Sequence, residues 1–355
     1  MKQLQKLRVK IDTIDKQILK LLNKRAELAK KIGKLKFLIG QTIYSPEREK
    51  EIIQRLIKLN KGPLDESDIK EIYTTIIHIC RHQQKKFIIA YLGPEGTFTH
   101  LAALDAFGNK NIYIAKETIG DVFYSVTKDE AEFGVVPVEN TTEGIVTHTL
   151  DMFLECNLYI CGEVNMKISH CLVSKENTIS NIKYVYSNPQ AIAQCKNYIS
   201  MKLANAKICE VSSTAEAAKI VANKKNSAAI ASEVTAKIYR LNILDKNIQD
   251  IEDNYTRFII IGKHKVARSG HDKTSIMFSL KDRVGILHDA LSPFKRYGIN
   301  LTKIESRPSK QRPWEYVFFV DFVGHINDKN VKKAISELEK LCVNYKFLGS
   351  YPRAE

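Results

Sequence analysis

The first 38 residues carry hydrophobic side chains at alternating steps of three and four, at Leu4, Leu7, Ile11, Ile14, Ile18, Leu21, Leu28, Ile32 and Leu35. Such spacing predicts an amphipathic helix that continues to about Leu38 and ends near Gly40. Arg25 occupies the one position of this series where a hydrophobic residue is expected. Because so long a helix cannot close a core with short neighbours, we expect the chain to form a homo-oligomer through this face.

Two shorter helices are predicted to follow. The second should begin at Ser45-Pro46-Glu47, with serine as the N-cap, proline in the first helical position and acidic residues in the first turn. It should end near Asn60-Lys61-Gly62-Pro63, and a third should run from about Asp65 or Ser67 to Gln84. Residues 1–86 are therefore predicted to form an all-helical, dimerising domain.

The hydrophobic pattern changes at Phe87. Over residues 87–264, helical patterns alternate with short runs typical of buried strands: KFIIAYLG, FGVVPVE, LYICGEV, HCLVS, YVYS, KICEV, SAAIAS and RFIIIG. This alternation predicts an α/β domain with a largely parallel sheet. Residues 273–352 are predicted to form an α+β domain of ferredoxin-like type, because the expected order is strand 274–280, helix 284–297, strand 299–306, strand 315–323, helix 328–341 and strand 344–350.

Composition narrows the classes of protein to which the chain can belong. The seven cysteines are scattered and never spaced C-x-x-C, which argues against a disulfide framework or a zinc site and favours a reducing cytoplasm. We find no apolar run long enough to cross a bilayer, and the first residues lack the apolar block of a signal peptide. We therefore expect a cytoplasmic protein without a membrane partner, a metal or a cofactor.

The net charge of +15 raises the question of nucleic-acid binding. Much of the charge lies in residues 1–86, which hold 21 Lys and Arg residues against 10 Asp and Glu residues. No helix-turn-helix, zinc finger or aromatic RNA-binding signature accompanies these cations. We interpret them as solvated helix faces that favour small anionic substrates, with a nucleic-acid-binding dimer as a minor alternative.

Two cations lie on the hydrophobic face of the first helix. Arg25 and Lys36 are eleven residues apart, so they point the same way at a separation of about 16 Å. Arg8 is about 25 Å from Arg25 and rotated away from this face. In one straight helix Arg8 cannot serve the same pocket, whereas in an antiparallel or crossed dimer it could reach the pocket of the partner.

The other two helices add polar side chains to this bundle: Arg48 and Glu49 in the second helix, and Gln84 at the end of the third. A cluster of cations with one carboxylate and one amide is costly in an apolar bundle unless an anion fills it. A small dicarboxylate would fill it. The alternative is that these side chains snorkel to the surface or form internal salt bridges.

These residues belong to motifs that resemble the all-helical chorismate mutases. The motifs are L-R-x-x-I-D-x-I-D, then L-L-x-x-R, then K-x-K and a P-E-R-E helix start, and together they span about 80 residues. The resemblance implies an active site shared between two protomers. It also implies that Arg25, Arg48 and the partner's Arg8 bind the two carboxylates of chorismate.

The same resemblance implies that Lys36 and Gln84 bond the ether oxygen of chorismate and that Glu49 bonds its ring hydroxyl. A pericyclic rearrangement needs no nucleophile or base, only a substrate held in its reactive conformer and stabilisation of the charge that grows on the ether oxygen. Ser45 and Cys80 stand where relatives often carry Asp and Ser. We include both among the candidate substrate contacts.

Three short motifs in the α/β segment fall after predicted strands, where such folds bind ligands: YLGPEGTFTH (91–100), GVVPVENTTEG (134–144) and DNYTRFIIIG (253–262). Their candidate site residues are Thr97, Thr99, Glu139, Asn140, Thr141, Thr256 and Arg257. None of the three matches a P-loop or a dinucleotide fingerprint, which disfavours an NAD-dependent dehydrogenase. Each motif by itself is more typical of a turn than of a site.

Together with S-N-P-Q (187–190) and S-S-T-A-E (212–216), these motifs resemble prephenate dehydratase over residues 88–264. The resemblance implies two α/β subdomains, as in a periplasmic binding protein, with the site between them. It implies that Thr256 donates or relays a proton to the departing hydroxyl of prephenate, with Glu139 or a water nearby. The other candidate substrate contacts are Thr97, Thr99, Asn140, Thr141, Ser187, Gln190, Ser213, Thr214 and Arg257.

The C-terminal segment contains DRVGILHDAL, with Gly285 at a helix start, and INLTKIESRP at the end of a strand. From the fold alone these would be an ordinary helix and hairpin. The pairing resembles the ACT domain fused to prephenate dehydratases, in which adjacent protomers enclose phenylalanine. Helix N-terminal amides would then bind its carboxylate, and Glu305 with nearby carbonyls its ammonium. The implied effector contacts are Gly285, Ile286, Leu287, Asn300, Glu305, Ser306, Arg307 and Pro308.

The order of these segments resembles the bifunctional bacterial enzymes of phenylalanine synthesis. It implies that the chain rearranges chorismate to prephenate, converts prephenate to phenylpyruvate, and is inhibited by phenylalanine. The alternative from another class is a regulatory protein, in which the α/β segment binds a small molecule without catalysis and the C-terminal domain senses an amino acid.

Overall fold

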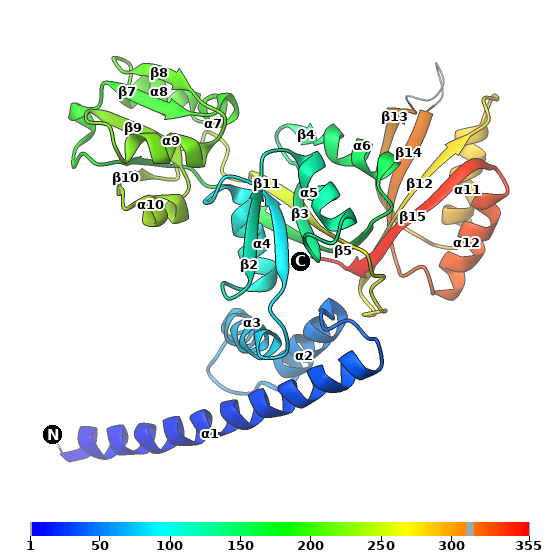
Figure 1. Ribbon diagram of the computed structural model, residues 1–355, viewed down its shortest axis with the longest axis horizontal. Coiled ribbons are helices and arrows are strands. Elements are labelled where there is room, and N and C mark those ends of the chain that lie inside the picture. The colour runs from blue at the N-terminus through cyan, green and yellow to red at the C-terminus, as the bar shows by residue number, and fades with distance from the viewer. Residues whose placement is uncertain (1, 310–315, 355) are drawn as a thin grey trace.

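The computed structural model describes residues 2–309 and 316–354, which form a helical unit, an α/β unit and a C-terminal α+β unit (Figure 1). The helical unit consists of α1 (Lys2–Leu38), α2 (Pro46–Leu59) and α3 (Glu66–His82). Asp65 caps α3 by accepting a hydrogen bond from the Asp68 amide. Ser45 precedes α2 as predicted, but its side chain makes no capping hydrogen bond. None of the helices in these residues is long and apolar enough to span a membrane.

The first half of α1 extends beyond the rest of the molecule (Figure 1). All nine hydrophobic side chains of its predicted face are exposed in the single chain, by between 48% and 65%. Near its other end, Gly33 is buried and packs against Gln84 after α3. The long helix therefore joins the unit only through its second half, and its hydrophobic face lacks a cover within the described chain.

The α/β unit contains two sheets. The first has the order β2-β1-β3-β11-β5, with the short β4 paired to β3. Its strands are β1 (Ile88–Leu92), β2 (Ile112–Lys116), β3 (Phe133–Asn140), β4 (Gly144–Ile145), β5 (Tyr159–Lys167) and β11 (Tyr255–Gly262). Its helices are α4 (Phe98–Phe107), α5 (Ile119–Thr127) and α6 (Thr147–Glu155).

The second sheet has the order β10-β6-β9-β7-β8 and lies apart from the first (Figure 1). Its strands are β6 (Cys171–Ser174), β7 (Tyr184–Ser187), β8 (Lys207–Glu210), β9 (Ser227–Ala231) and β10 (Asn242–Lys246). Its helices are the 3₁₀ turn η1 (Ile179–Asn181), α7 (Pro189–Gln194), α8 (Lys196–Lys202), α9 (Thr214–Val221) and α10 (Glu233–Tyr239). The expectation of two α/β subdomains is confirmed.

The expectation of a largely parallel sheet is wrong, because both sheets are mixed. The chain leaves the first sheet after β5 and returns as β11, which inserts between β3 and β5 and runs antiparallel to both. In the second sheet β6 is antiparallel to β9 and β10, whereas β7 is parallel to β8 and β9. Hydrophobic runs identify these strands, but their direction depends on how the chain crosses between the two sheets.

The C-terminal unit has the predicted βαββαβ order. Its elements are β12 (Asp272–Leu280), α11 (Ile286–Arg296), β13 (Leu301–Pro308), β14 (Tyr316–Val323), α12 (Lys329–Glu339) and β15 (Cys342–Pro352). Residue 315, the expected start of the third strand, lies outside the described residues. The strand order is β13-β14-β12-β15, with both helices on one face (Figure 1). The other face packs on the first α/β sheet, since Phe319 and Leu348 share a core with Val136 and Phe153.

Candidate active sites and effector site

The helical unit brings Lys36, Ser45 and Glu49 together where α1 meets the start of α2. The Lys36 ammonium donates to the Ser45 hydroxyl at 2.6 Å and to the Thr42 carbonyl at 3.1 Å. Burial lowers the pKa of Lys36, and the charges of Glu47 and Glu49 oppose this shift. The hydroxyl of Ser45 is thus occupied by the lysine, which explains why it does not cap α2.

Gln84 lies against α1, one turn before Lys36. A Cβ atom on Gly33 would be 2.7 Å from the Cβ of Gln84, so the glycine allows this close approach. The Oε1 atom of Gln84 is buried and has no hydrogen-bond partner within the described chain. Cys80 is buried one turn earlier, on α3. A buried amide oxygen without a partner is suited to accept a hydrogen bond from a polar ligand atom.

The three candidate arginines are arranged differently. Arg25 is half-buried on α1, whereas Arg8 is exposed near the far end of that helix. Arg48 is exposed and pairs with Glu51 at 2.6 Å. The single chain therefore does not bring Arg8 to Lys36, which is what the helix geometry led us to expect.

Sequence reasoning missed Arg81, which is only 3% exposed. Its guanidinium donates to Glu49 Oε1 at 2.7 Å and to the Ala106 carbonyl of α4 at 2.8 Å. It also lies over the rings of Tyr44 and Phe107, at 5.3 and 5.5 Å from the centroids. Burial raises the pKa of Glu49, and Arg81 opposes that shift. The available signal was a cation directly after the hydrophobic run of the third helix.

A cavity of about 560 Å³ lies between the two α/β subdomains. Seven of the predicted residues line it: Thr97, Thr99, Asn140, Gln190, Ser213, Thr214 and Thr256. Thr97 caps α4 and Ser213 caps α9, so the first turns of both helices are at the cavity. Their amide groups favour anions. No lysine or arginine is among the described residues that line the cavity.

Thr256 and Asn140 are neighbours across β11 and β3. Asn140 Nδ2 donates to the Thr256 hydroxyl oxygen at 2.8 Å and to Asn254 Oδ1 at 2.8 Å. Asn140 Oδ1 accepts from the Thr142 hydroxyl at 2.6 Å. Because the threonine oxygen accepts from Asn140, its hydrogen remains available for donation to a group in the cavity.

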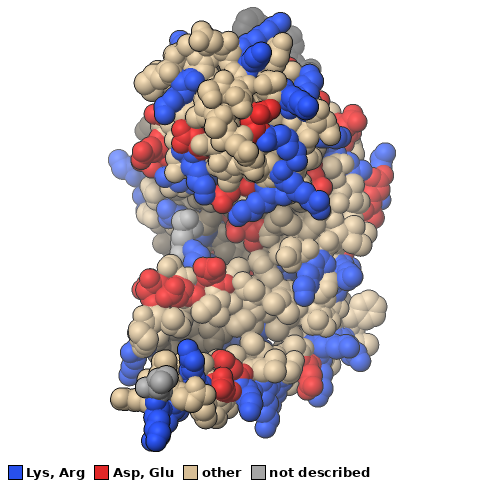
Figure 2. All heavy atoms as spheres, turned by 90° about the vertical axis from the view of Figure 1, so that its left-hand side faces the viewer, with Lys and Arg blue, Asp and Glu red and all other residues tan. Residues whose placement is uncertain are grey.

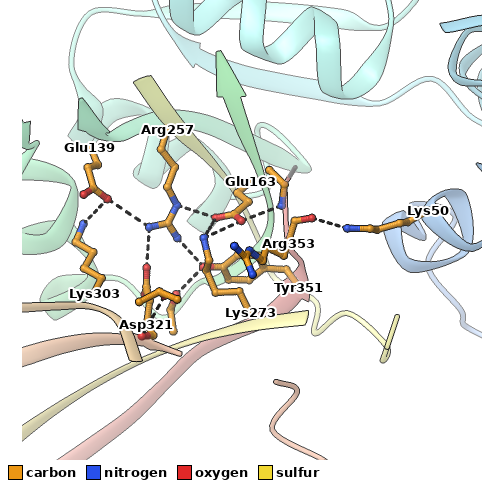
Figure 3. Close-up of polar contacts among 12 residues, drawn as sticks. Lys50, Glu139, Glu163, Arg257, Lys273, Lys303, Asp321, Tyr351 and Arg353 are labelled. Atoms are coloured by element: carbon orange, nitrogen blue, oxygen red, sulfur yellow. Dashed lines mark hydrogen bonds and ion pairs between the residues drawn. The ribbon is translucent and has the colours of Figure 1, made fainter. Parts of the chain in front are cut away.

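Two predicted substrate contacts lie on the opposite face of the same strands. Arg257 donates to Glu163 at 2.7 Å, to Asp321 of β14 at 2.7 Å and to Tyr351 of β15 at 2.9 Å (Figure 3). Glu139 lies 3.4 Å from Lys303 of β13. The structure does not bring Arg257 or Glu139 to the cavity, because successive side chains of a strand point to opposite faces.

Two more predicted contacts also lie outside the cavity lining. The Ser187 hydroxyl is buried and donates to the Ile230 carbonyl at 2.8 Å within the second sheet. The Thr141 hydroxyl accepts from the Tyr255 amide at 2.9 Å. In both cases the hydroxyl bonds a backbone group. These two residues therefore stabilise the backbone around the cavity and do not face it.

Sequence reasoning missed His170 and Gln194, which line the cavity. His170 Nε2 lies 2.9 Å from Gln194 Oε1, and Gln194 Nε2 donates to Glu143 at 2.9 Å. Burial lowers the pKa of His170, so its imidazole is neutral near pH 7. Gln194 thereby links the second subdomain to the first across the cavity. In the sequence, Gln194 could have been identified as a second glutamine four residues after Gln190.

The candidate effector residues occupy α11 and β13. Gly285 has a φ of 76° at the start of α11, and no atom lies within 4 Å of where its Cβ would be. Ile286 and Leu287, in the first turn, are half-buried. Because β13 is an edge strand, its exposed side is open to a second chain.

Along β13 the predicted residues alternate between two faces. Glu305 and Arg307 are half-buried, and Arg307 donates to Asp151 of α6 at 3.2 Å. Asn300, just before the strand, and Ser306 and Pro308 are exposed. The predicted effector residues therefore belong to two surfaces, one facing the α/β unit and one facing solvent.

Comparison with known proteins identifies the three units. Residues 7–85 match the family Chorismate mutase type II, residues 89–266 match Prephenate dehydratase and residues 274–340 match the ACT domain. The bifunctional chorismate mutase/prephenate dehydratase of Aquifex aeolicus is 48% identical over 358 residues, which cover 100% of this chain and 99% of the relative. That of Escherichia coli is 32% identical and covers 98% of this chain and 95% of the relative.

Solved structures resemble the second and third units. A prephenate dehydratase of Arthrobacter aurescens in complex with L-Phe has a TM-score of 0.71 and 34% identity, covering 75% of this chain and 90% of that one. The prephenate dehydratase of Staphylococcus aureus has a TM-score of 0.66 and 31% identity. The match covers 74% of this chain and 99% of that one. With three family matches in the same order and full-length relatives, the chain belongs to the bifunctional chorismate mutase/prephenate dehydratases.

Proposed function

We propose that this chain rearranges chorismate to prephenate in its helical unit and converts prephenate to phenylpyruvate in its α/β unit, under feedback inhibition by phenylalanine. The observation that carries the proposal is the pairing of Asn140 with Thr256 at a cavity, in a chain that also places Lys36 beside Glu49. We propose domain limits of 1–86, 87–264 and 273–352.

For the mutase, we propose that Lys36 and Gln84 stabilise the developing charge on the ether oxygen and that Glu49 accepts from the ring hydroxyl. Ser45 orients the Lys36 ammonium through their 2.6 Å hydrogen bond, and Cys80 lines the site beside Gln84. Arg25 and Arg48 bind the carboxylates together with the partner's Arg8. This arrangement supplies orientation and charge stabilisation, which suffice for a unimolecular rearrangement.

The shared site requires a homodimer, which we propose forms through the exposed hydrophobic face of α1. Burying large apolar side chains contributes about 1.5–3 kcal/mol each, so nine exposed ones in one stripe provide a strong driving force. A hydrophobic stripe of this extent on a charged helix is typical of a helix that packs on a partner.

For the dehydratase, we propose that the Thr256 hydroxyl relays a proton from a water molecule in the cavity to the departing hydroxyl of prephenate. The bond from the ring to its carboxylate breaks, its electron pair enters the ring, and the ring hydroxyl leaves with a proton as water. Helix N-termini at Thr97 and Ser213 bind the carboxylates, and no lysine or arginine of the described residues lines the cavity, so within this part of the chain the carboxylate that leaves as CO₂ is not held by an ion pair. Aromatisation supplies the driving force.

Further contacts follow from the lining of the cavity. We propose that Thr99, Gln190 and Thr214 contact prephenate directly. Thr141 and Ser187 contribute indirectly, because their hydroxyls form hydrogen bonds with backbone groups near the cavity. Glu139 and Arg257 do not contact prephenate, because they lie on the face of β3 and β11 that is turned away from the cavity. We propose that they influence the dehydratase through these two strands.

For regulation, we propose that phenylalanine binds the α11 start and the β13 end of two adjacent chains, as the effector residues named above suggest. The solved relative from Arthrobacter aurescens contains L-Phe, and β13 is an open edge here. We also propose a cytoplasmic location and catalysis without a cofactor. Nucleic acid is not a proposed partner, since Figure 2 shows lysine and arginine interspersed with acidic and uncharged residues on the face it presents.

One assay tests the whole proposal: purified protein is given chorismate, and phenylpyruvate is followed with and without phenylalanine. Formation of phenylpyruvate that falls when phenylalanine is added supports all three parts. Accumulation of prephenate without phenylpyruvate would show that the assignment of dehydratase activity to the α/β unit is wrong. Absence of any reaction would favour the ligand-binding regulatory protein.

A further inference from the structure

The pairing of β3 with β11 places two residue pairs on opposite faces of one ladder. Thr256 is opposite Asn140, and Arg257 is opposite Glu139. The first pair faces the cavity, whereas the second faces the sheet of the ACT domain. A β-bulge follows directly after Arg257, and bulges of this kind re-aim side chains beside active sites. The two pairs are joined by single peptide bonds, so a backbone displacement at the second pair can be passed to the first.

The ACT domain presents a matching pair. Lys303 of β13 is opposite Asp321 of β14 in the register of that sheet. Arg257 bonds Asp321 at 2.7 Å, and Lys303 lies 3.4 Å from Glu139, so the two cross-strand pairs meet face to face (Figure 3). Lys303 is two residues before Glu305 on the same strand and points to the same side.

Three hydrogen bonds hold the Arg257 side chain in its position. Besides Asp321, it bonds Glu163 of β5, which also accepts from Lys273 at 2.8 Å, and the Tyr351 hydroxyl (Figure 3). Burial alone would lower the pKa of Arg257, but Tyr351, Asp321 and Glu163 raise it above its ordinary value. Burial alone would raise the pKa of Asp321, but Arg257 and Ser275 lower it. Both groups are therefore charged.

We propose that Arg257 is a positioning residue of the dehydratase, held by Asp321 of the ACT domain, and that the Lys303–Glu139 contact makes its position depend on the effector strand. This inference rests on the proposed dehydratase and on its inhibition by phenylalanine. Two of the three bonds from the guanidinium go to the ACT domain, to Asp321 and Tyr351. The catalytic Thr256 is thus aligned only while the ACT sheet holds its present place against β11.

Few residues separate the proposed effector contact Glu305 from the proposed catalytic residue Thr256. A displacement of β13 at Glu305 reaches Lys303 within one strand and Asp321 through the β13–β14 pairing. From there it passes to Glu139 and Arg257, and then along the backbone to Asn140 and Thr256. Each step is a bonded or directly contacting pair, so the coupling needs no larger rearrangement than a slide of one sheet over the other.

The test compares Lys303→Met and Asp321→Asn with the parent, using prephenate as substrate. Lys346→Met is the matched control, because Lys346 lies at the same domain interface but donates to the Phe153 and Cys156 carbonyls, away from the ladder. We expect Asp321→Asn to lower the dehydratase kcat about tenfold with little change in KM. We expect Lys303→Met to weaken inhibition by phenylalanine at least about fivefold while calorimetry still detects phenylalanine binding.

Mutase activity should be unchanged in all three variants, and retained phenylalanine binding with a parent-like KM for prephenate verifies that the mutated domains fold. A double-mutant cycle of Glu139→Gln with Lys303→Met should be non-additive in the degree of inhibition. Parent-like kcat, KM and inhibition in Asp321→Asn and Lys303→Met, or an equal effect of Lys346→Met, would overturn the inference. If the parent makes no phenylpyruvate, or makes it without inhibition, the proposed function itself fails.

Discussion

Arg81 donates to Glu49 at 2.7 Å and, through its second terminal nitrogen, to the carbonyl of Ala106 at 2.8 Å. One buried guanidinium therefore joins the candidate mutase site to the last turn of α4. Thr97, at the other end of α4, lines the dehydratase cavity. The two candidate active sites are thus connected through a single helix and a single side chain.

Replacing Arg81 should change the pH dependence of the mutase. Burial raises the pKa of Glu49, whereas Arg81 and, to a smaller extent, Lys36 lower it, so Arg81→Met removes the larger opposing effect and raises that pKa further. The proposed role of Glu49 needs the ionised form, so the acid limb of mutase kcat/KM should move to higher pH. Arg81→Lys, which keeps the charge, should restore most of the original profile. An unchanged acid limb in Arg81→Met would contradict this role.

Replacing Arg25 should separate the two activities. Arg25→Ala removes the proposed charge-assisted contact to a substrate carboxylate, so mutase kcat/KM should fall about a hundredfold, or about 2.7 kcal/mol. Turnover of prephenate to phenylpyruvate should remain at the parent rate. Kinetics with chorismate and with prephenate on the same preparation provide the measurement. Equal loss of both activities on folded protein would show that the assignment of Arg25 is wrong.

The hydrophobic face of α1 predicts the oligomeric state. Ile14→Glu places a charge in the middle of the exposed stripe and should weaken the dimer by about 2 kcal/mol per subunit. Sedimentation over a range of concentrations should show dissociation, with loss of mutase but not of dehydratase activity. Lys16→Glu, on the opposite face of the same helix, is the control. A variant that stays dimeric would place the interface elsewhere.

Removing the hydroxyl of Thr256 should affect turnover more than binding. Thr256→Val keeps the shape but leaves no donor for the departing hydroxyl, so kcat should fall about a hundredfold or more while KM changes little. Thr256→Ser retains the donor and should keep much of the activity. Mutase activity should be the same in both variants. Phenylpyruvate formation by Thr256→Val at the parent rate would exclude this residue as the donor.

Glu305 should matter only when phenylalanine is present. Glu305→Gln removes the carboxylate proposed to bind the ammonium of the effector, so the concentration for half-inhibition should rise about tenfold or more. The uninhibited rate should stay the same. Glu339→Gln, on an exposed position of the same domain, should leave inhibition unchanged. Full sensitivity in Glu305→Gln would move the effector site to other residues.

Several features of the molecule follow from local patterns alone. The 3–4 spacing of α1, the start of α3 to within two residues and the order of elements in the C-terminal unit could be predicted, because they depend on residues close together in sequence. The motifs around Thr97, Asn140, Ser213 and Thr256 were each ambiguous from local pattern. Their resemblance to prephenate dehydratase, not the pattern itself, implied that they share one site between two α/β subdomains.

Other features depend on contacts between residues that are far apart in the chain. The motif containing Thr256 and Arg257 suggested one substrate site, but the two side chains point to opposite faces of β11, and only the packing of the ACT sheet explains where Arg257 goes. Nothing near Arg81 in the sequence indicated its partners, because Glu49 and Ala106 lie 32 and 25 residues away. Local periodicity sets which elements form, whereas long-range packing sets strand direction and which partner each buried charge finds.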